Sequence, residues 1–245
     1  GENHTSTTGT HNPQMQQNAI VGGELNNIET TSGNIHNSTI LGGRAGTITT
    51  TTGDTYGAAI IGGTGCQIGP NDASYSVIAG GFGSEIRGGD NAFITGRQNI
   101  IHDGDYSFIS GRLNTITGVQ CAIVGGRNNR IDPLVVTGSS VILGGLQNDV
   151  WARYSTIIGG AFHEVYPPSD AGTIVGGATN GITGPICEIF GGQNNRVDNP
   201  GITGGTIMGG NQNAIFAAGR SAIIAGTSNI LYGTASRSVI MGGQN

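Results

Sequence analysis

The residues best suited to recognition chemistry in this chain are aromatic side chains with carboxylates nearby. The chain has a single Trp, Trp151, and its six Tyr are Tyr56, Tyr75, Tyr106, Tyr154, Tyr166 and Tyr232. An aromatic ring stacks on the apolar side of a sugar ring, and carboxylates accept hydrogen bonds from its hydroxyl groups. We expect Trp151, Tyr154 and Tyr166 to form the strongest glycan or receptor contact, with Tyr106 and Tyr232 as further contacts. The alternative is that these rings only cover the edges of neighbouring structural units.

Paired carboxylates are the second candidate chemistry. Two acids about 5 to 9.5 Å apart can hydrolyse a glycosidic bond, and Asp103 and Asp105 flank Gly104, with Asp90 one repeat earlier. Acids beside Gly are also typical turn formers, and we favour that interpretation. The sequence shows no Ser-His-Asp set, no phosphate-binding loop and no catalytic Cys-His pair. We therefore predict that the protein is not an enzyme and uses no cofactor.

Metal ligation has little support in the sequence. Segments 62–65 and 80–83 resemble the start of calcium-binding Gly-Gly-x-Gly-x-Asp repeats, but the Asp that should follow is missing. Cys66, Cys121 and Cys187 have neither metal-ligand spacing nor adjacent places in the repeat that would suit a disulfide. We expect buried free thiols and no metal site.

Composition and charge exclude further function classes. The 245 residues include 47 Gly, 10 basic and 15 acidic residues, for a formal net charge of −5, and every basic residue is Arg. An acidic balance gives no electrostatic basis for binding a phosphate backbone, so we expect no nucleic-acid partner. No run of about 18 apolar residues is present, so we expect no membrane insertion.

The candidate residues are positioned by a cassette that occurs fourteen times. The cassette has two apolar residues, a small residue that is usually Gly, an unvarying Gly, a polar residue three places on and an apolar residue five places on, as in 123–131. We number the unvarying Gly as position zero; examples are Gly23, Gly43, Gly63, Gly126 and Gly145. Successive zero glycines are 15 to 20 residues apart. We expect ten cassette positions to keep a constant length and the connecting arc to take up all the variation.

The cassette predicts strands. Short β-branched stretches bounded by Gly favour strands, and a helix would lose about 1 kcal/mol for each interior Gly relative to Ala. Each cassette then supplies a strand, a Gly-led turn and a second strand, and successive copies stack in parallel. The expected fold class is all-β, a parallel β-solenoid (β-roll) of about 13–14 short coils. We expect 1–17 to be a polar N-terminal segment or a degenerate first coil, and 18–245 to be the repeat domain of a longer chain.

Two cassette positions are assigned structural roles. Position plus three is Asn in most cassettes, including Asn129 and Asn195. Stacked Asn side chains can form a hydrogen-bonded ladder, and Asn tolerates tight turns. We assign a positive φ to the Gly at position zero, and a close backbone approach between chains to the small residue at minus one.

Position minus two is apolar in every cassette and predicts association between chains. Neighbouring strand residues point to opposite faces, so positions minus three and minus two cannot both fill the interior of the coil. A monomer would then expose a continuous apolar row, and we expect a coil of 15 residues to enclose too little core by itself. Identical chains packed around a shared axis would remove both problems, and we expect a homotrimer.

With this cassette, the chain resembles the heads of trimeric autotransporter adhesins and the parallel β-rolls of phage tail fibres and spikes. Segments 76–81 and 238–243 match the alternating apolar residues and the Ile-Gly step of those repeats most closely. The resemblance implies a fibre on a virion surface or a bacterial cell surface that attaches to a cell-surface glycan or receptor. The longer and less regular period favours the phage type over an adhesin head. A polysaccharide-degrading spike is a third possibility.

Overall fold

The computed structural model describes residues 5–8, 15–132, 138–200, 203–233 and 236–244. Over these ranges the chain is all-β, has no helix and forms a parallel β-solenoid of about 13 turns, which confirms the fold class expected from the cassette. The chain divides into two compact units, 1–125 and 126–245. The two units are built alike, and each is described by itself.

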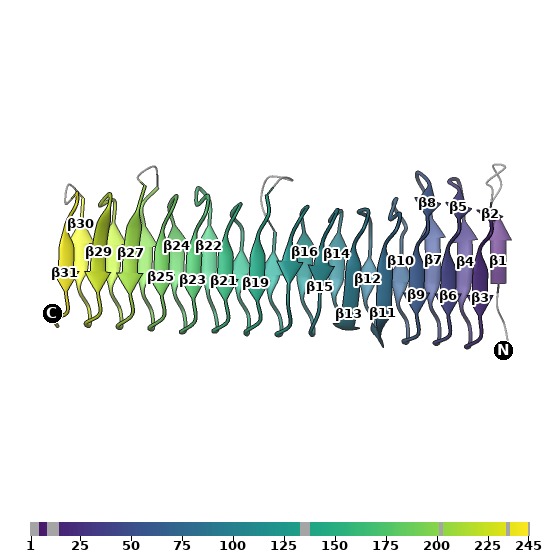
Figure 1. Cartoon of the computed structure of the whole chain (residues 1–245), viewed down its shortest axis with the longest axis horizontal. Helices are drawn as coiled ribbons and strands as arrows, with labels where there is room; N and C mark the ends of the chain where they lie inside the picture. The colour runs from purple at the N-terminus through teal and green to yellow at the C-terminus, as the bar shows by residue number, and fades with distance from the viewer. Residues whose placement is uncertain (1–4, 9–14, 133–137, 201–202, 234–235, 245) are drawn as a thin grey trace. The chain divides into compact units, whose positions relative to one another are not determined.

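In the first unit, the strands before and after each zero Gly form separate parallel sheets, the pre-turn sheet and the post-turn sheet (Figure 1). The pre-turn sheet consists of β3 (Ala19–Val21), β6 (Thr39–Leu41), β9 (Ala59–Ile61), β11 (Val77–Phe82), β13 (Phe93–Arg97), β15 (Phe108–Ile109) and β17 (Ala122–Ile123). The post-turn sheet consists of β1 (Thr5–Thr8), β4 (Asn27–Thr30), β7 (Thr47–Thr50), β10 (Gln67–Ile68), β12 (Glu85–Ile86), β14 (Ile100–His102) and β16 (Thr115–Thr117). A third sheet in the arcs contains β2 (Met15–Gln16), β5 (Ile35–His36) and β8 (Thr55–Tyr56).

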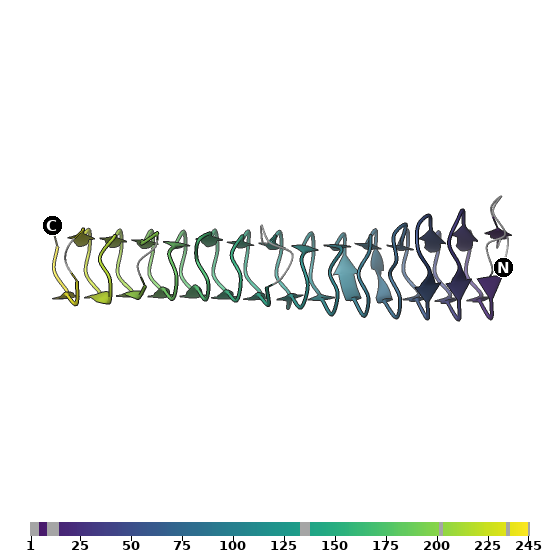
Figure 2. The same ribbon diagram turned by 90° about the horizontal axis from the view of Figure 1, so that it is seen from above.

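The second unit repeats the two main sheets. Its pre-turn sheet consists of β19 (Val141–Leu143), β21 (Thr156–Ile158), β23 (Thr173–Val175), β25 (Glu188–Phe190), β27 (Gly205–Met208), β29 (Ser221–Ile224) and β31 (Val239–Met241). Its post-turn sheet consists of β18 (Arg130–Ile131), β20 (Asp149–Val150), β22 (Glu164–Tyr166), β24 (Gly181–Thr183), β26 (Arg196–Asp198), β28 (Ala214–Phe216) and β30 (Ile230–Tyr232). Each coil adds one strand to each sheet, and the sheets lie in two layers joined by arcs and turns (Figure 2).

The core consists of apolar side chains that meet between the two layers. Ile157 and Ile174 at position minus three, and Val165 and Ile182 at position plus five, are fully buried. Burying one side chain of this size contributes roughly 1.5–3 kcal/mol, and the contact recurs along the unit. A single chain therefore fills its own interior. Our expectation that a short coil encloses too little core is wrong, because the two layers are close enough for one side chain from each to fill the space.

The Asn residues at position plus three form a ladder along the interior. The Asn180 side-chain oxygen accepts a hydrogen bond from the backbone N–H of Asn195 (2.9 Å). The Asn195 side-chain oxygen likewise accepts one from the backbone N–H of Asn213 (3.0 Å). The Asn195 side-chain amide also donates to the carbonyl oxygens of Gly191 in its own turn and Gly210 in the next, at 3.3 and 3.1 Å. Each Asn thus ties its own turn to the next coil, chiefly through backbone groups.

A second interior column lies five places before the zero Gly and holds small side chains. The Ser155 hydroxyl oxygen accepts a hydrogen bond from the Gly172 N–H of the next coil (3.2 Å). Cys121 and Cys187 stand at this cassette position, whereas Cys66 stands at the Asn position. All three cysteines are buried thiols, as expected. They serve as small interior side chains, and burial raises the pKa of the Cys187 thiol.

Both turn glycines adopt the left-handed conformation, which confirms the positive φ expected of the Gly at position zero. Gly42 and Gly43 both have positive φ, +73° and +84°. A Cβ on Gly42 would meet nothing within 4 Å, whereas a Cβ on Gly43 would lie 2.7 Å from the carbonyl oxygen of Gly63 in the next coil. Crowding therefore requires Gly at position zero, while the left-handed backbone alone favours Gly at minus one. The left-handed backbone at minus one is therefore a reason for Gly within the single chain, and the expected close packing between chains at this position stays a prediction.

Two coils in the first unit have a shorter turn. The register between β11 and β13 shifts because β11 has two turn glycines where β13 has only Gly96. Ile94 consequently faces the interior and is fully buried, while Phe93 points outward and stacks on Phe108 at a centroid distance of 5.5 Å. The expectation of a constant cassette length is therefore wrong for these coils. The sequence did not reveal the difference, because the residue before Gly96 is small, as in the other cassettes.

Candidate functional site

The outer face of the post-turn sheet in the second unit carries two columns of side chains. Parallel pairing aligns the positions four and six places after each zero Gly, at a spacing of about 4.8 Å per coil. The first column contains Arg130, Asp149, Glu164, Gly181, Arg196, Ala214 and Ile230. The second column contains Asp132, Trp151, Tyr166, Thr183, Asp198, Phe216 and Tyr232.

Stacked aromatic pairs occupy part of the second column. The rings of Trp151 and Tyr166 lie 6.4 Å apart at an interplanar angle of 12°. The guanidinium of Arg130 lies 4.4 Å from the centre of the Trp151 ring, within the range of a cation–π contact. The rings of Phe216 and Tyr232 stack at 5.4 Å and 16°. These pairs give the face rigid apolar platforms among polar side chains.

The structure separates the aromatic residues that the sequence grouped. Trp151 and Tyr166 lie together, and Tyr232 belongs to the other stacked pair. Tyr154 instead lies at the corner where the arc leads into β21, with a φ of +52°. Tyr106 has the same conformation at a corner in the first unit, with a φ of +54°. Proximity along the chain suggested one patch, but the left-handed corner has no signature in the apolar pattern.

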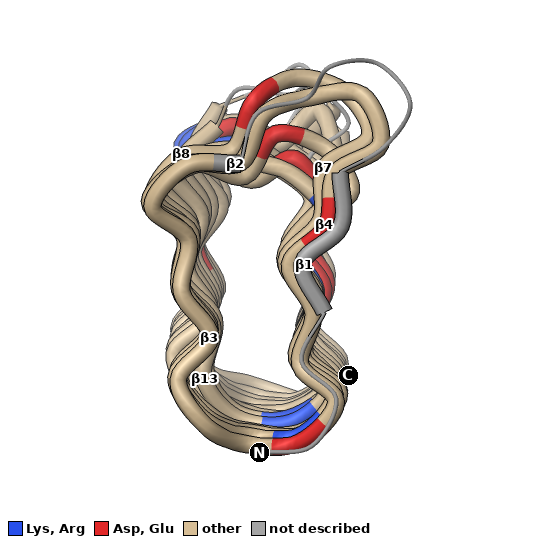
Figure 3. Tube along the Cα trace, turned by 90° about the vertical axis from the view of Figure 1, so that its right-hand side faces the viewer, with Lys and Arg blue, Asp and Glu red and all other residues tan. Residues whose placement is uncertain are grey.

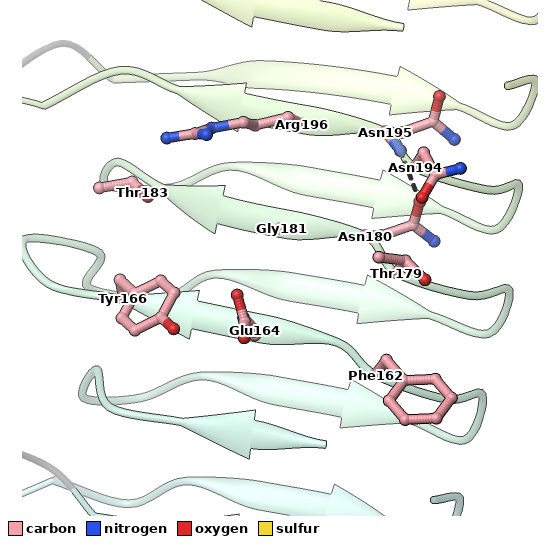
Figure 4. Close-up of a pocket in the computed structure, with 10 residues that line it drawn as sticks. All are labelled: Phe162, Glu164, Tyr166, Thr179, Asn180, Gly181, Thr183, Asn194, Asn195 and Arg196. Carbon is pink, nitrogen blue, oxygen red and sulfur yellow. Dashed lines mark hydrogen bonds between the residues drawn. The ribbon is translucent and has the colours of Figure 1, made fainter. Parts of the chain in front are cut away.

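A notch interrupts the first column at Gly181 (Figure 4). Its floor is the glycine itself, and Glu164 and Arg196 flank it from the strands on either side. Tyr166 and Phe162 lie toward its two ends, and its volume is about 380 Å³. Sequence reasoning missed this site. The available signal was a Gly at position plus four, where the other complete cassettes have a side chain.

Charges of both signs surround the notch. The Nη2 atom of Arg196 lies 2.8 Å from Oδ2 of Asp198 in an ion pair on the surface. Burial raises the pKa of Asp149; Arg130 opposes this shift and Glu164 adds to it. Burial also raises the pKa of Tyr166, with a further contribution from Glu164. The surface therefore offers hydrogen-bond donors and acceptors together.

The acids considered for catalysis connect successive arcs of the first unit. The Asp105 carboxylate accepts a hydrogen bond from the Asp90 N–H (2.8 Å), and the Asp90 carboxylate accepts one from the Ser74 N–H (2.7 Å). Burial raises the pKa of Asp90, and the bond from Ser74 opposes that shift. Asp103 has a φ of +46°, as in a turn. The geometry favours the turn-forming interpretation.

Neither a metal centre nor a known family helps to define the site. Among the described residues, no three His, Cys, Asp or Glu side chains are grouped so as to hold a metal ion. The same part of the chain has no helix with the length and apolar character needed to cross a membrane. No family model and no curated protein matches this sequence.

Proposed function

We propose that this chain is a structural segment of an extended surface fibre that attaches to a host cell surface, of the phage tail fibre or spike type, and that it assembles as a homotrimer. One observation carries the proposal. The two outer faces of each unit have opposite chemical character although they share one backbone geometry.

The pre-turn face of the second unit is almost uncharged. Its outward strand positions are Val141, Leu143, Thr156, Ile158, Thr173, Val175, Glu188, Phe190, Thr206, Met208, Ala222, Ile224, Val239 and Met241. Among these described positions Glu188 alone is charged. The post-turn face of the same unit has six charged residues in its two columns: Arg130, Asp132, Asp149, Glu164, Arg196 and Asp198.

The first unit shows the same contrast. Viewed end-on, its acidic and basic residues lie in the arcs, in the turns and on the wall formed by β4 and β7 (Figure 3). The wall that contains β3 and β13 is mostly uncharged in the same view, and its residues Leu41 and Ile61 are each 48 % exposed. A monomer would leave a long apolar row in water, and such rows are typical of protein interfaces.

A second and third copy of the chain are the partners that fit this face. Every coil already fills its own interior, so the apolar face is available for contact between chains. The face repeats with the coil spacing, and only another solenoid matches that spacing along its whole length. Three copies around a shared axis would cover the pre-turn face of each chain and leave the post-turn faces outward.

The outward face is suited to attachment. It carries the stacked pair of Trp151 and Tyr166 on rigid strands, beside hydrogen-bonding groups of both signs. We propose that this face binds a cell-surface glycan, which would place the chain on a virion. A bacterial trimeric adhesin head would have the same build and would place it on a bacterial surface.

A polysaccharide-degrading spike is the third candidate. Incubation of the protein with capsular polysaccharide, followed by sizing of the polymer, separates it from the others. We expect no shortening, because Asp90 and Asp105 are already engaged with backbone N–H groups.

The attachment function is tested with Trp151→Ala. The change removes the ring that stacks on Tyr166 and contacts Arg130, and we expect binding to host cells or purified glycans to fall about tenfold or more. Tyr154→Ala removes a ring at the corner and should have a much smaller effect. Unchanged binding by Trp151→Ala would contradict the proposal.

A further inference from the structure

We infer that the notch at Gly181 is a binding site for a short neutral saccharide, a mono- or disaccharide. The inference rests on the attachment function proposed above and names the ligand class and the position of the site. The notch volume of about 380 Å³ lies at the lower end of the ~300–1,000 Å³ that is usual for small-molecule sites.

The fold does not explain why residue 181 is Gly. Its φ is outside the left-handed region, and a Cβ there would meet only the carbonyl oxygen of Glu164 at 3.9 Å, an ordinary contact. Gly181 is the first residue of β24, and Gly is less favourable than Ala in a strand. In strands it often marks a place where a ligand approaches the backbone closely. At this position, a closely bound ligand explains the glycine where packing and strain do not.

The walls of the notch offer a donor on one side and an acceptor on the other. Glu164 and Arg196 are the register partners of Gly181 on the two adjacent strands, so their backbones are roughly 9.6 Å apart. A carboxylate only accepts hydrogen bonds and a guanidinium only donates them, whereas a sugar hydroxyl does both. The Thr183 side chain, which also lines the notch, adds a hydroxyl group.

Aromatic rings lie toward both ends of the notch. Tyr166 is 39 % exposed and Phe162 is 47 % exposed, on opposite sides of the Gly181 floor (Figure 4). Each ring offers an apolar surface for the C–H side of a pyranose. A polar centre with an aromatic ring toward each end matches a ligand that has hydroxyl groups along its edges and apolar faces.

The charges select a neutral ligand. An anion would meet like charge from Glu164 and Asp198, and the positive charge of Arg196 is already shared with Asp198 at 2.8 Å. A cation would meet like charge from Arg196. A neutral saccharide uses the donor and the acceptor without the cost of desolvating a charge of its own.

Gly181→Thr tests the site because it fills the notch without breaking the fold. A β-branched residue suits a strand, so the thermal midpoint should be unchanged or higher. The matched control is Ala214→Thr, which adds a similar side chain in the same column outside the notch. The probes are cellobiose, maltose, lactose and mannobiose, with sialyllactose as the anionic comparator, each titrated in calorimetry and in NMR.

We expect wild-type protein to bind at least one neutral disaccharide. Gly181→Thr should weaken that binding about tenfold or more by steric exclusion, and Ala214→Thr should leave it within about twofold. The inference is overturned if no neutral disaccharide binds, if sialyllactose is preferred, or if Gly181→Thr binds as well as wild type.

Cell attachment separates this inference from the proposed function. Attachment that is lost in Trp151→Ala and kept in Gly181→Thr would overturn the notch as a site and support the attachment face. A wild-type protein that binds a disaccharide through the notch but attaches to no cell would support the site and overturn the attachment function.

Discussion

His163 occupies a place in the interior ladder that Asn fills in the neighbouring coils. The backbone N–H of His163 donates to the Asn148 side-chain oxygen (3.1 Å). The Nδ1 atom of its ring accepts a hydrogen bond from the backbone N–H of Asn180 (3.2 Å). The ring can accept that bond only while Nδ1 carries no proton. Burial lowers the pKa of His163 below its ordinary value of about 6.5. The ladder at this coil therefore depends on a neutral ring.

This dependence predicts a pH effect on stability. The unfolded chain takes up a proton near pH 6.5 and the folded chain only at lower pH, so stability is complete above about pH 6.5 and falls as the pH drops. His163→Asn restores the ladder side chain and should reduce this loss. Thermal midpoints between pH 8 and pH 5 measure the effect, with His36→Asn as a control in a half-exposed position. Equal slopes for wild type and His163→Asn would refute it.

Asn195 is the residue at which the ladder itself is best tested. Asn195→Ala leaves the backbone N–H of Asn213 without its acceptor and removes one of the two donors to each of the turn carbonyls of Gly191 and Gly210. An unsatisfied buried group costs about 1–3 kcal/mol, so the free energy of unfolding should fall by at least that amount. Urea unfolding measures the loss. Gln193→Ala, in the turn of the same coil, should change stability much less, and an equal loss in both variants would argue against the ladder.

At the scale of the strand–turn–strand element, the close approach of successive coils explains the unvarying Gly. Gly43→Ala would place a Cβ 2.7 Å from the carbonyl oxygen of Gly63, whereas Gly42→Ala would place one in open space. Both variants carry the strain of a positive φ, about 1–2 kcal/mol. Only Gly43→Ala adds the collision, so it should lose more stability in thermal unfolding. Equal losses would show that φ alone selects both glycines.

The same element shows how far the sequence can predict this fold. The strands and the interior apolar residues repeat in every coil and the ladder Asn in most of them, so the periodic pattern predicts them. The pattern does not predict the shorter turn at Gly96, because Phe93 and Ile94 are both apolar and either could face the interior. Only the pairing of β11 with β13 shows which residue does so.

The candidate site was predicted only in part for a related reason. Trp151 and Tyr166 stand at the same cassette position in consecutive coils, which alignment of the cassettes can reveal. Tyr154 lies at a left-handed corner that the apolar pattern does not mark. Gly181 could have been found as an exception at its cassette position. Its meaning depends on the contacts a Cβ would make, which only the structure provides.

At the scale of the whole molecule, the two outer faces of each unit have different roles in the proposed assembly. Phe190 on the pre-turn face is 43 % exposed, while Phe216 on the post-turn face stacks with Tyr232. In the proposed trimer, Phe190→Glu would bury an unpaired charge between chains and should cause dissociation, because a buried unpaired charge costs several kcal/mol. Phe216→Glu makes the same change on the outward face and should leave the assembly intact. Size-exclusion chromatography with light scattering compares them, and identical behaviour of both variants would contradict the assignment of faces.

Sedimentation velocity of the unmodified chain tests the proposed assembly into a homotrimer. We expect a single species with the mass of three chains, because the apolar pre-turn face should be buried between copies of the same solenoid. A well-behaved monomer at micromolar concentration would contradict that claim, since the pre-turn face would then remain exposed to water.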